Sequence, residues 1–194
     1  MIDKDEIREI ILGVASEIFA RYGFNKTTMD DIARGMGKGK SSIYYYFKNK
    51  EDIFREVVEK EVVKMKTRTR LAMEKESDPR EKLRVYIQVR MQGFENFLNL
   101  YAVLKTEFLS HFDFVEQIRQ KYDKEETSII KGILDEGIKA KMFIIEDTYL
   151  TALAIFTAMK GMEIPLFTAN HSKDQDDIRF DKLMDVLFYG IMKR

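Results

Sequence analysis

The segment from Thr27 to Lys50 combines hydroxyl, basic and tyrosine side chains of the kinds that contact nucleic acid. Its charged residues from position 34 onward are all basic, with no Asp or Glu among them: Arg34, Lys38, Lys40, Lys48 and Lys50. Such side chains bind DNA phosphates and read base edges in the major groove. Because the whole chain has a formal net charge of zero, this positive segment is a local feature and indicates contact with DNA.

Two short helices and a glycine turn are predicted to present these residues. Thr28, as a cap, opens the first helix together with Asp31. Gly37 and Gly39 form the turn, and Ser41 or Ser42 is predicted to cap the second helix. That helix buries Ile43 and Phe47, which lie one turn apart, and leaves Ser42, Tyr45 and Tyr46 pointing elsewhere, with Tyr44 at the edge. A compact helix-turn-helix with an acid-free second helix suits the DNA major groove.

The rest of the chain is predicted to be helical, and the fold class is all-α. The 194 residues include only two prolines and ten glycines, and no strand pattern of any length is present. Asp3 with Glu6 is predicted to cap the first helix as a capping box, and Gly23 to end it. The expected helices, about nine in number, cover approximately 3–22, 28–36, 41–47, 50–76, 79–98, 100–110, 113–140, 147–165 and 176–193, and 168–177 is expected to be a loop.

Composition excludes several classes of site. The chain has no cysteine, so disulfides, thiolate metal ligands and cysteine nucleophiles are absent. Glu107 and His111 have the spacing of two metal ligands on one helix, but no further ligands accompany them, and no metal site is predicted. Phosphate-binding glycine loops, nucleophile elbows and kinase motifs are also missing, so we expect neither a cofactor nor enzymatic activity.

No membrane segment is expected. The first residues are charged and lack the apolar core of a signal peptide. The most apolar stretch, 149–167, is interrupted by Lys160, Glu163 and Pro165, whereas a span needs about 20 mostly apolar residues. The sequence therefore favours a cytoplasmic protein without a membrane partner.

The last two predicted helices are more apolar than a single buried stripe requires. Ala154, Ala158 and Gly161 form a line of small residues that would let another helix approach closely. We expect these helices to pair with their copies in a homodimer; the alternative is a central place in a monomer core. The residues predicted for the dimer interface are Ala154, Ala158, Gly161, Met162, Leu183, Leu187, Phe188 and Ile191.

The first 55 or so residues resemble the DNA-binding domain of TetR-type transcriptional regulators. The resemblance is carried by Tyr22-Gly23-Phe24, Thr27-Thr28, Asp31-Ile32-Ala33, Gly37-Lys38-Gly39-Lys40, Ile43-Tyr44-Tyr45-Tyr46-Phe47 and Lys50-Glu51-Asp52-Ile53. It implies an all-α dimer in which residues 1–50 form the helix-turn-helix DNA-binding domain. Residues 51–194 would then form the domain for effector binding and dimerisation.

The resemblance also implies roles for individual residues of the helix-turn-helix. Those expected to face base edges are Lys40, Ser41, Ser42 and Tyr45, and those expected at phosphates are Thr28, Tyr44, Tyr46, Lys48 and Lys50. Lys40 is the best candidate for reading guanine, although a phosphate contact is an equally good interpretation. Lys38 replaces the small apolar residue that many members have after the turn glycine, and it either adds a phosphate contact or is solvated.

An effector site in the middle of the chain is the least constrained prediction. Aromatic and methionine residues concentrate there in a way typical of an apolar cavity with few polar anchors. An ordinary helical core would show the same spacing. The candidate ligand-binding residues are Met65, Met91, Phe94, Phe97, Tyr101, Glu107, Phe108, Tyr122, Phe156 and Met159.

The resulting hypothesis is a sequence-specific DNA-binding transcriptional regulator. We expect a repressor that is released from a palindromic operator by a small, largely apolar ligand. Its partners would be double-stranded DNA, a second copy of the chain and an effector. The alternatives are a helical protein-interaction module and an all-helical enzyme without DNA function. Light scattering would separate the first alternative from a homodimer, and substrate turnover or a bound metal would support the second.

Overall fold

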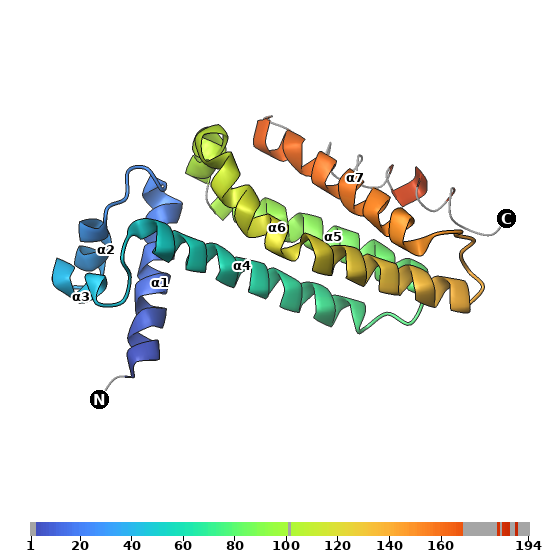
Figure 1. Ribbon diagram of the computed structural model, residues 1–194, viewed down its shortest axis with the longest axis horizontal. Coiled ribbons are helices and arrows are strands. Elements are labelled where there is room, and N and C mark those ends of the chain that lie inside the picture. The colour runs from blue at the N-terminus through green and yellow to red at the C-terminus, as the bar shows by residue number, and fades with distance from the viewer. Residues whose placement is uncertain (1–2, 101, 169–181, 183, 187–188, 190–194) are drawn as a thin grey trace. The chain divides into compact units, whose positions relative to one another are not determined.

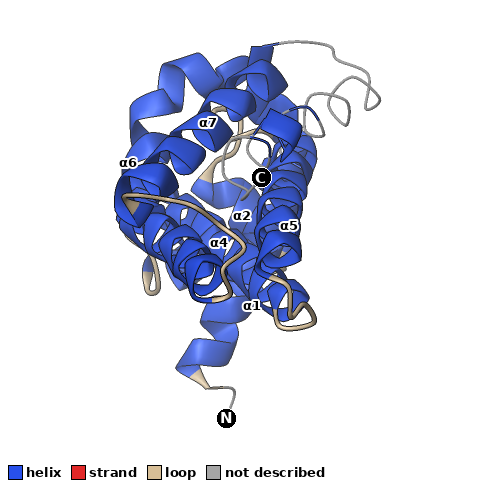
Figure 2. Ribbon diagram, turned by 90° about the vertical axis from the view of Figure 1, so that its right-hand side faces the viewer, coloured by secondary structure: helices blue, strands red, loops and turns tan. Residues whose placement is uncertain are grey.

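The computed structural model describes residues 3–100, 102–168, 182, 184–186 and 189, with the backbone alone at 95, 96, 98–100, 102–119 and 163–168. In the described part of the chain, every regular element is a helix (Figures 1 and 2). The helices are α1 (Lys4–Tyr22), α2 (Met29–Gly35), α3 (Lys40–Tyr44), α4 (Lys50–Met73), α5 (Pro79–Leu100), α6 (Ala102–Lys139) and α7 (Thr148–Thr168). None of the described helices combines the length and the apolar character that crossing a bilayer requires.

The chain forms two compact units. The first contains Met1–Lys64 and Asn96–Ile118, and the second contains Met65–Glu95 and Arg119–Arg194. Helix α4 runs without interruption through both, so the division between the compact units falls inside a helix. The division into a DNA-binding domain of residues 1–50 and an effector domain of residues 51–194 stays a prediction about function.

The core of the first unit fixes the short helices against α1 and α4. Three aromatic rings pack with centroids 4.9–5.9 Å apart, and all three are buried: Phe19 of α1, Phe24 of the loop that follows α1, and Phe54 of α4. Ile32 of α2 and Ile43 of α3 are fully buried as well. Burial of one apolar residue from each short helix is what holds helices too short to be stable alone.

The second unit has its own core, built from α5, α6 and α7. Its buried members include Leu83, Ile87, Ile130, Leu134 and Ile155. Phe143, from the turn between α6 and α7, closes the end of this core against α6. Each helix contributes residues spaced three or four apart, as amphipathic helices do when they share a core.

Two local predictions about the helices were wrong. The sequence predicts two helices separated by a break near residue 111, but α6 is one helix of 38 residues. Only Gly132 and Gly137 weaken it and no proline interrupts its backbone hydrogen bonds. Asp3 occupies the N-cap position of α1, but its side chain makes no cap hydrogen bond, so the expected capping box with Glu6 does not form. The predicted helix at 176–193 and loop at 168–177 lie almost entirely outside the described residues.

Candidate nucleic-acid interface

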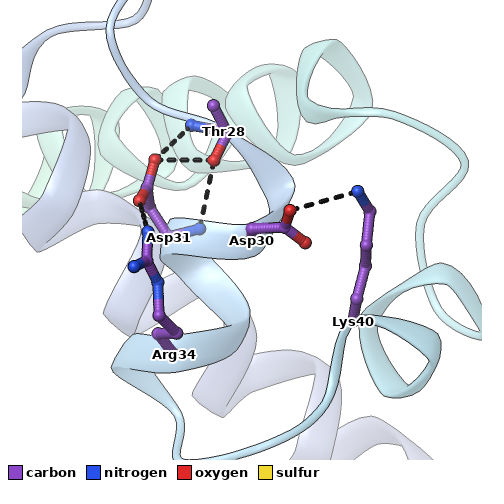
Figure 3. A network of polar contacts seen from close by, with 5 residues as sticks. All are labelled: Thr28, Asp30, Asp31, Arg34 and Lys40. Carbon is purple, nitrogen blue, oxygen red and sulfur yellow. Dashed lines mark hydrogen bonds and ion pairs between the residues drawn. The ribbon is translucent and has the colours of Figure 1, made fainter.

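Helix α2 begins at the Thr28 cap that the sequence predicts, and the structure shows this cap to be a full capping box. The Thr28 hydroxyl accepts from the backbone N–H of Asp31 at 3.2 Å, and the Asp31 carboxylate accepts from the backbone N–H of Thr28 at 2.9 Å. The Asp31 carboxylate also pairs with Arg34 one turn later (Figure 3). The Thr28 side chain is therefore fixed at the N-terminus of α2, and the residue is exposed.

The capping box makes the stability of α2 depend on pH. The hydrogen bond from the Thr28 hydroxyl, with that of the Thr28 backbone and the Arg34 guanidinium, holds the pKa of Asp31 below its usual value of 3.8. A lowered carboxyl pKa contributes stability above 3.8 that is lost as the pH falls through the lowered value. We expect Asp31→Asn to be less stable than the wild type at about pH 6 and the gap to close toward about pH 2 in urea denaturation. Asp30→Asn, which leaves the cap intact, is the control; an equal, pH-independent loss in both variants would contradict the assignment.

Helix α3 is anchored by two apolar residues and presents its other side to solvent. Ile43 and Phe47 are buried, as predicted. The predicted serine cap is wrong, because α3 already begins at Lys40 with Gly39 at the N-cap, and both serines lie inside the helix. The turn before it depends on Gly37, whose φ of 64° is the left-handed conformation that glycine adopts without strain.

α3 and the segments around it expose most of the side chains predicted to contact DNA. The exposed residues of that set are Thr28, Lys38, Lys40, Ser41, Ser42, Tyr44, Tyr45 and Lys48, whereas Tyr46 and Lys50 are half-buried. Tyr45, which is 70% exposed, packs edge-on against the Tyr46 ring at a centroid distance of 4.9 Å. The Lys4 ammonium lies 5.2 Å from the Tyr45 ring centroid. The exposed residues in and around α3 therefore offer hydroxyls, rings and ammonium groups.

Arg8 of α1 holds the end of α3 in place. Its guanidinium pairs with Glu56 of α4, with Nε 3.0 Å from Oε2, and its Nη1 donates to the Tyr46 carbonyl at 3.1 Å. The same guanidinium lies 4.2 Å from the Phe47 ring centroid. Sequence reasoning missed this residue, because its partners lie 38 and 48 positions away along the chain.

Lys50 has a structural role in addition to the one predicted. Its ammonium donates to the carbonyls of Phe24 at 2.8 Å, Thr27 at 3.0 Å and Asn25 at 3.4 Å, and it lies 4.4 Å from the Phe24 ring centroid. These contacts hold the loop that ends at the Thr28 cap. A phosphate contact by Lys50 stays a prediction, and binding DNA through this ammonium would compete with the three carbonyls.

Lys40 has a partner that the acid-free sequence segment did not suggest. Its ammonium lies 3.2 Å from the Asp30 carboxylate of α2, and both side chains are about half exposed (Figure 3). The hydrogen bond to Asp30 and its charge, with that of Tyr44, raise the pKa of Lys40. Packing of α2 against α3 thus places a carboxylate at the start of α3.

A groove of about 490 Å³ lies between the end of α1 and α2. It is lined by Glu17, Ile18, Arg21, Tyr22, Lys26, Thr27, Asp31, Arg34 and Gly35. None of the residues predicted to contact DNA lines it. The candidate interface is therefore the exposed side of α3, not this groove.

The predicted ligand-binding residues divide into three groups. Phe156 and Met159 belong to the core of the second unit, Met91 packs against that core, and Phe94 is buried. Met65, Phe97 and Tyr122 are half-buried. Tyr101 and the side chains of Glu107 and Phe108 lie outside the described part of the structure. The core interpretation left open by the sequence thus holds for Met91, Phe156 and Met159, and a ligand contact by any of the ten stays a prediction.

A buried polar cluster in the second unit was not anticipated. Arg90 of α5 donates from Nε to Glu126 of α6 at 3.0 Å, and both side chains are at least 90% buried. The Tyr86 hydroxyl is buried beside them without a hydrogen-bond partner among the described atoms. Burial and the nearby Glu126 charge raise the pKa of Tyr86. The sequence does not reveal this cluster. Tyr86 and Arg90 lie four residues apart on α5, and the same spacing of Tyr and Arg is common on exposed helix surfaces.

Helix α7 exposes an apolar row. Leu150, Leu153, Ala154 and Gly161 are exposed and lie at helical spacing on one side, with Ala158 and Met162 half-buried. Of the predicted dimer residues, Leu183, Leu187, Phe188 and Ile191 lie outside the described residues. The opposite side of α7 packs into the core through Ala152, Ile155 and Met159. Helix α7 is therefore apolar on two sides, as the sequence predicts.

The fold and the exposed α3 surface together define a helix-turn-helix protein, and comparisons with known proteins agree. Residues 11–57 match the family described as bacterial regulatory proteins, tetR family. The HTH-type transcriptional regulator QacR of Staphylococcus aureus is 26% identical over 190 residues, which cover 96% of this chain and 99% of QacR. The fatty acid metabolism regulator protein of Bacillus subtilis is 28% identical over 131 residues, 67% of each chain.

A solved structure extends the similarity over nearly the whole chain. The crystal structure of a transcriptional regulator from Cytophaga hutchinsonii is 27% identical, has a TM-score of 0.78, and covers 95% of this chain and 98% of its own. Residues 11–57 thus form a DNA-binding domain of the tetR family, and the chain is a DNA-binding transcriptional regulator. These relatives are named as regulators and not as enzymes, in agreement with the sequence prediction.

Proposed function

We propose that the protein is a dimeric repressor that binds a palindromic operator through α3 and leaves it when a small, largely apolar ligand binds. The observation that carries this proposal is the surface of α3. Two buried residues anchor the helix, while its lysine, serine and tyrosine side chains remain exposed. A helix anchored in this way can enter the major groove without moving its buried side chains. Such a repressor would act in the cytoplasm.

The proposed contacts fall into two kinds. Lys40, Ser41, Ser42 and Tyr45 would face base edges, and Lys40 is best suited to guanine O6 and N7. The residues proposed for phosphates are Thr28, Lys38, Tyr44, Tyr46 and Lys48, with Lys50 holding the adjoining loop as its main role. Phosphate contacts fix the position of the protein, and base contacts select the sequence.

A second copy of the chain is the proposed partner of the exposed row on α7. An apolar row of leucine, alanine and glycine residues is poorly suited to face water, and its small residues allow close helix contact. Two-fold symmetry would present two α3 helices to successive major grooves, about 34–36 Å apart for half-sites one helical turn apart. A palindromic operator follows from that symmetry.

The proposed effector is a small apolar molecule bound within residues 51–194. Support comes from the aromatic and methionine residues that the sequence places along α5, α6 and α7, and from the relative named for fatty acid metabolism. The ligand must bind the DNA-incompetent state more tightly, and about 1.4 kcal/mol of preference changes the equilibrium tenfold. Helix α4 is the proposed coupling element, since its residues belong to both compact units.

Selection of bound duplexes from a random DNA pool tests the proposal. At near-physiological salt we expect enrichment of a palindrome, and light scattering should show a dimer. The selected operator then allows a screen of apolar ligands for release. Binding that is only salt-sensitive and selects no sequence would contradict the proposed readout, and equal operator affinity with and without ligands that demonstrably bind would contradict the proposed release.

Alanine variants separate base readout from phosphate contact. Lys40→Ala and Tyr45→Ala should change the preferred sequence, each with a loss of about 1–3 kcal/mol on the selected operator. Lys48→Ala should weaken binding to all sequences alike and reduce the slope of log affinity against log salt by about one. Fluorescence anisotropy on operator and shuffled duplexes measures both effects. Uniform weakening by all three variants would show that the proposed division between base and phosphate contacts is wrong.

A further inference from the structure

We propose that Asp30 is a specificity-determining residue that restrains Lys40 until a base edge replaces it. The inference rests on the proposed function of α3 as the helix that reads DNA. Asp30 is the second residue of α2 and Lys40 is the first of α3, and their side chains meet across the turn (Figure 3). The ammonium proposed to read DNA is thus held by a carboxylate of the same domain.

The pair is accessible to DNA. The Lys40 Nζ and the Asp30 Oδ2 lie 3.2 Å apart, and the two side chains are 56% and 50% exposed. The Lys40 ammonium also lies 5.9 Å from the Tyr44 ring centroid, which keeps it over α3. An exposed ion pair is weak enough to be replaced by a contact with DNA, because it changes an equilibrium constant by about fivefold at most.

Asp30 is free for this role because its neighbour carries the structural one. Asp31 accepts the hydrogen bonds of the capping box and pairs with Arg34. The Asp30 carboxylate takes no part in the cap, and its ion pair is with Lys40. Two adjacent aspartates therefore have separate partners, and replacing Asp30 leaves the start of α2 intact.

The carboxylate makes the two kinds of DNA contact unequal. A phosphate that takes the Lys40 ammonium replaces one anion by another and is repelled by the nearby Asp30. Guanine offers two neutral acceptors, O6 and N7, to the ammonium, and the amino group of a cytosine can donate to the released carboxylate. Asp30 should therefore weaken binding to unselected DNA more than binding to an operator with a G·C pair at this position.

The experiment compares Asp30→Asn with a variant that makes the same charge change elsewhere. Glu17→Gln removes a carboxylate of α1 that lines the α1–α2 groove, and none of the residues proposed to contact DNA lines that groove. Affinity for the selected operator and for a shuffled duplex of equal length is measured at several salt concentrations. We expect Asp30→Asn to raise affinity for the shuffled duplex up to about fivefold more than affinity for the operator. Glu17→Gln should change both affinities by the same factor.

Two further measurements test whether Lys40 is the group that Asp30 acts on. The specificity ratio is the affinity for the operator divided by the affinity for the shuffled duplex. In the Lys40→Ala background, Asp30→Asn should no longer change this ratio, so the effects of the two substitutions on it are not additive. Repeating the selection with Asp30→Asn should relax the preference at the same operator position that Lys40→Ala relaxes. A general change in fold or charge would not single out one position.

The outcomes separate this inference from the proposed function. If the wild type selects no sequence, the proposed function fails, and the inference fails with it. If the wild type selects a palindrome while Asp30→Asn behaves as Glu17→Gln does, only the role of Asp30 is overturned. Additive effects of Asp30→Asn and Lys40→Ala on the specificity ratio would overturn it too. A selective gain on shuffled DNA that disappears without Lys40 supports it.

Discussion

Glu126→Ala is expected to lower the free energy of unfolding by about 3–5 kcal/mol, because it removes one partner of a buried ion pair. Arg90 and Glu126 are 6% and 10% exposed in their side chains, and Nε and Oε2 lie 3.0 Å apart. The variant leaves the Arg90 guanidinium in the core without this carboxylate. For a chain of this size the loss corresponds to a drop of about 6–20 °C in Tm, which thermal and urea unfolding would measure.

The adjacent residue provides a matched control. Glu125 also pairs with a basic residue, Lys66 of α4, but its side chain is 55% exposed. Because solvent screens this pair, Glu125→Ala should lower stability by no more than about 1 kcal/mol. A similar loss in both variants would show that burial of the Arg90–Glu126 pair is not what determines its contribution.

The double replacement Arg90→Met with Glu126→Leu tests the cause directly. If the loss in Glu126→Ala comes from a buried charge without its carboxylate, then two apolar side chains of similar size should restore stability to within about 1 kcal/mol of the wild type or exceed it. A double variant as unstable as Glu126→Ala would instead indicate that the polar groups themselves fix the packing of α5 against α6.

The sequence predicted the helix-turn-helix well because its signals are local. Each of these signals depends on residues within one or two helical turns of each other: the Thr28 cap of α2, Gly23 at the C-cap of α1, and the buried Ile43 and Phe47. The predicted serine cap of α3 failed because serine occurs both at caps and inside helices. Ser41 and Ser42 are acceptable inside a helix, so their presence did not fix where α3 begins.

The candidate site was predicted only in part, because charge partners depend on tertiary packing. Sequence reasoning found the exposed residues of α3 but not Asp30, Arg8 or the carbonyls that bind Lys50. A lysine or arginine on a predicted helix has many possible acceptors along the chain. Which acceptor it meets is decided by how α1, α2 and α4 pack, and periodicity does not carry that information.

Gly137→Ala is expected to lower the free energy of unfolding by about 1–3 kcal/mol, although alanine favours helices. A β-carbon at this position of α6 would lie inside the van der Waals contact distance of the Phe143 ring. The ring is 4% exposed within the core of the second unit. The chain reversal also holds it in place, because the backbone N–H groups of Met142 and Phe143 donate to the Gly137 carbonyl at 2.9 and 3.2 Å. The ring therefore has little freedom to give way.

Gly132→Ala on the same helix should have the opposite sign. Nothing lies within 4 Å of a β-carbon built there, and the residue is exposed. Removing glycine from a helix interior should then raise stability by about 0.5–1 kcal/mol. Urea denaturation of both variants isolates the close approach of Phe143, because backbone entropy and helix propensity change alike in the two. In a Phe143→Leu background the Gly137→Ala loss should shrink, and a gain in stability from Gly137→Ala in the wild-type background would show that the ring can move aside.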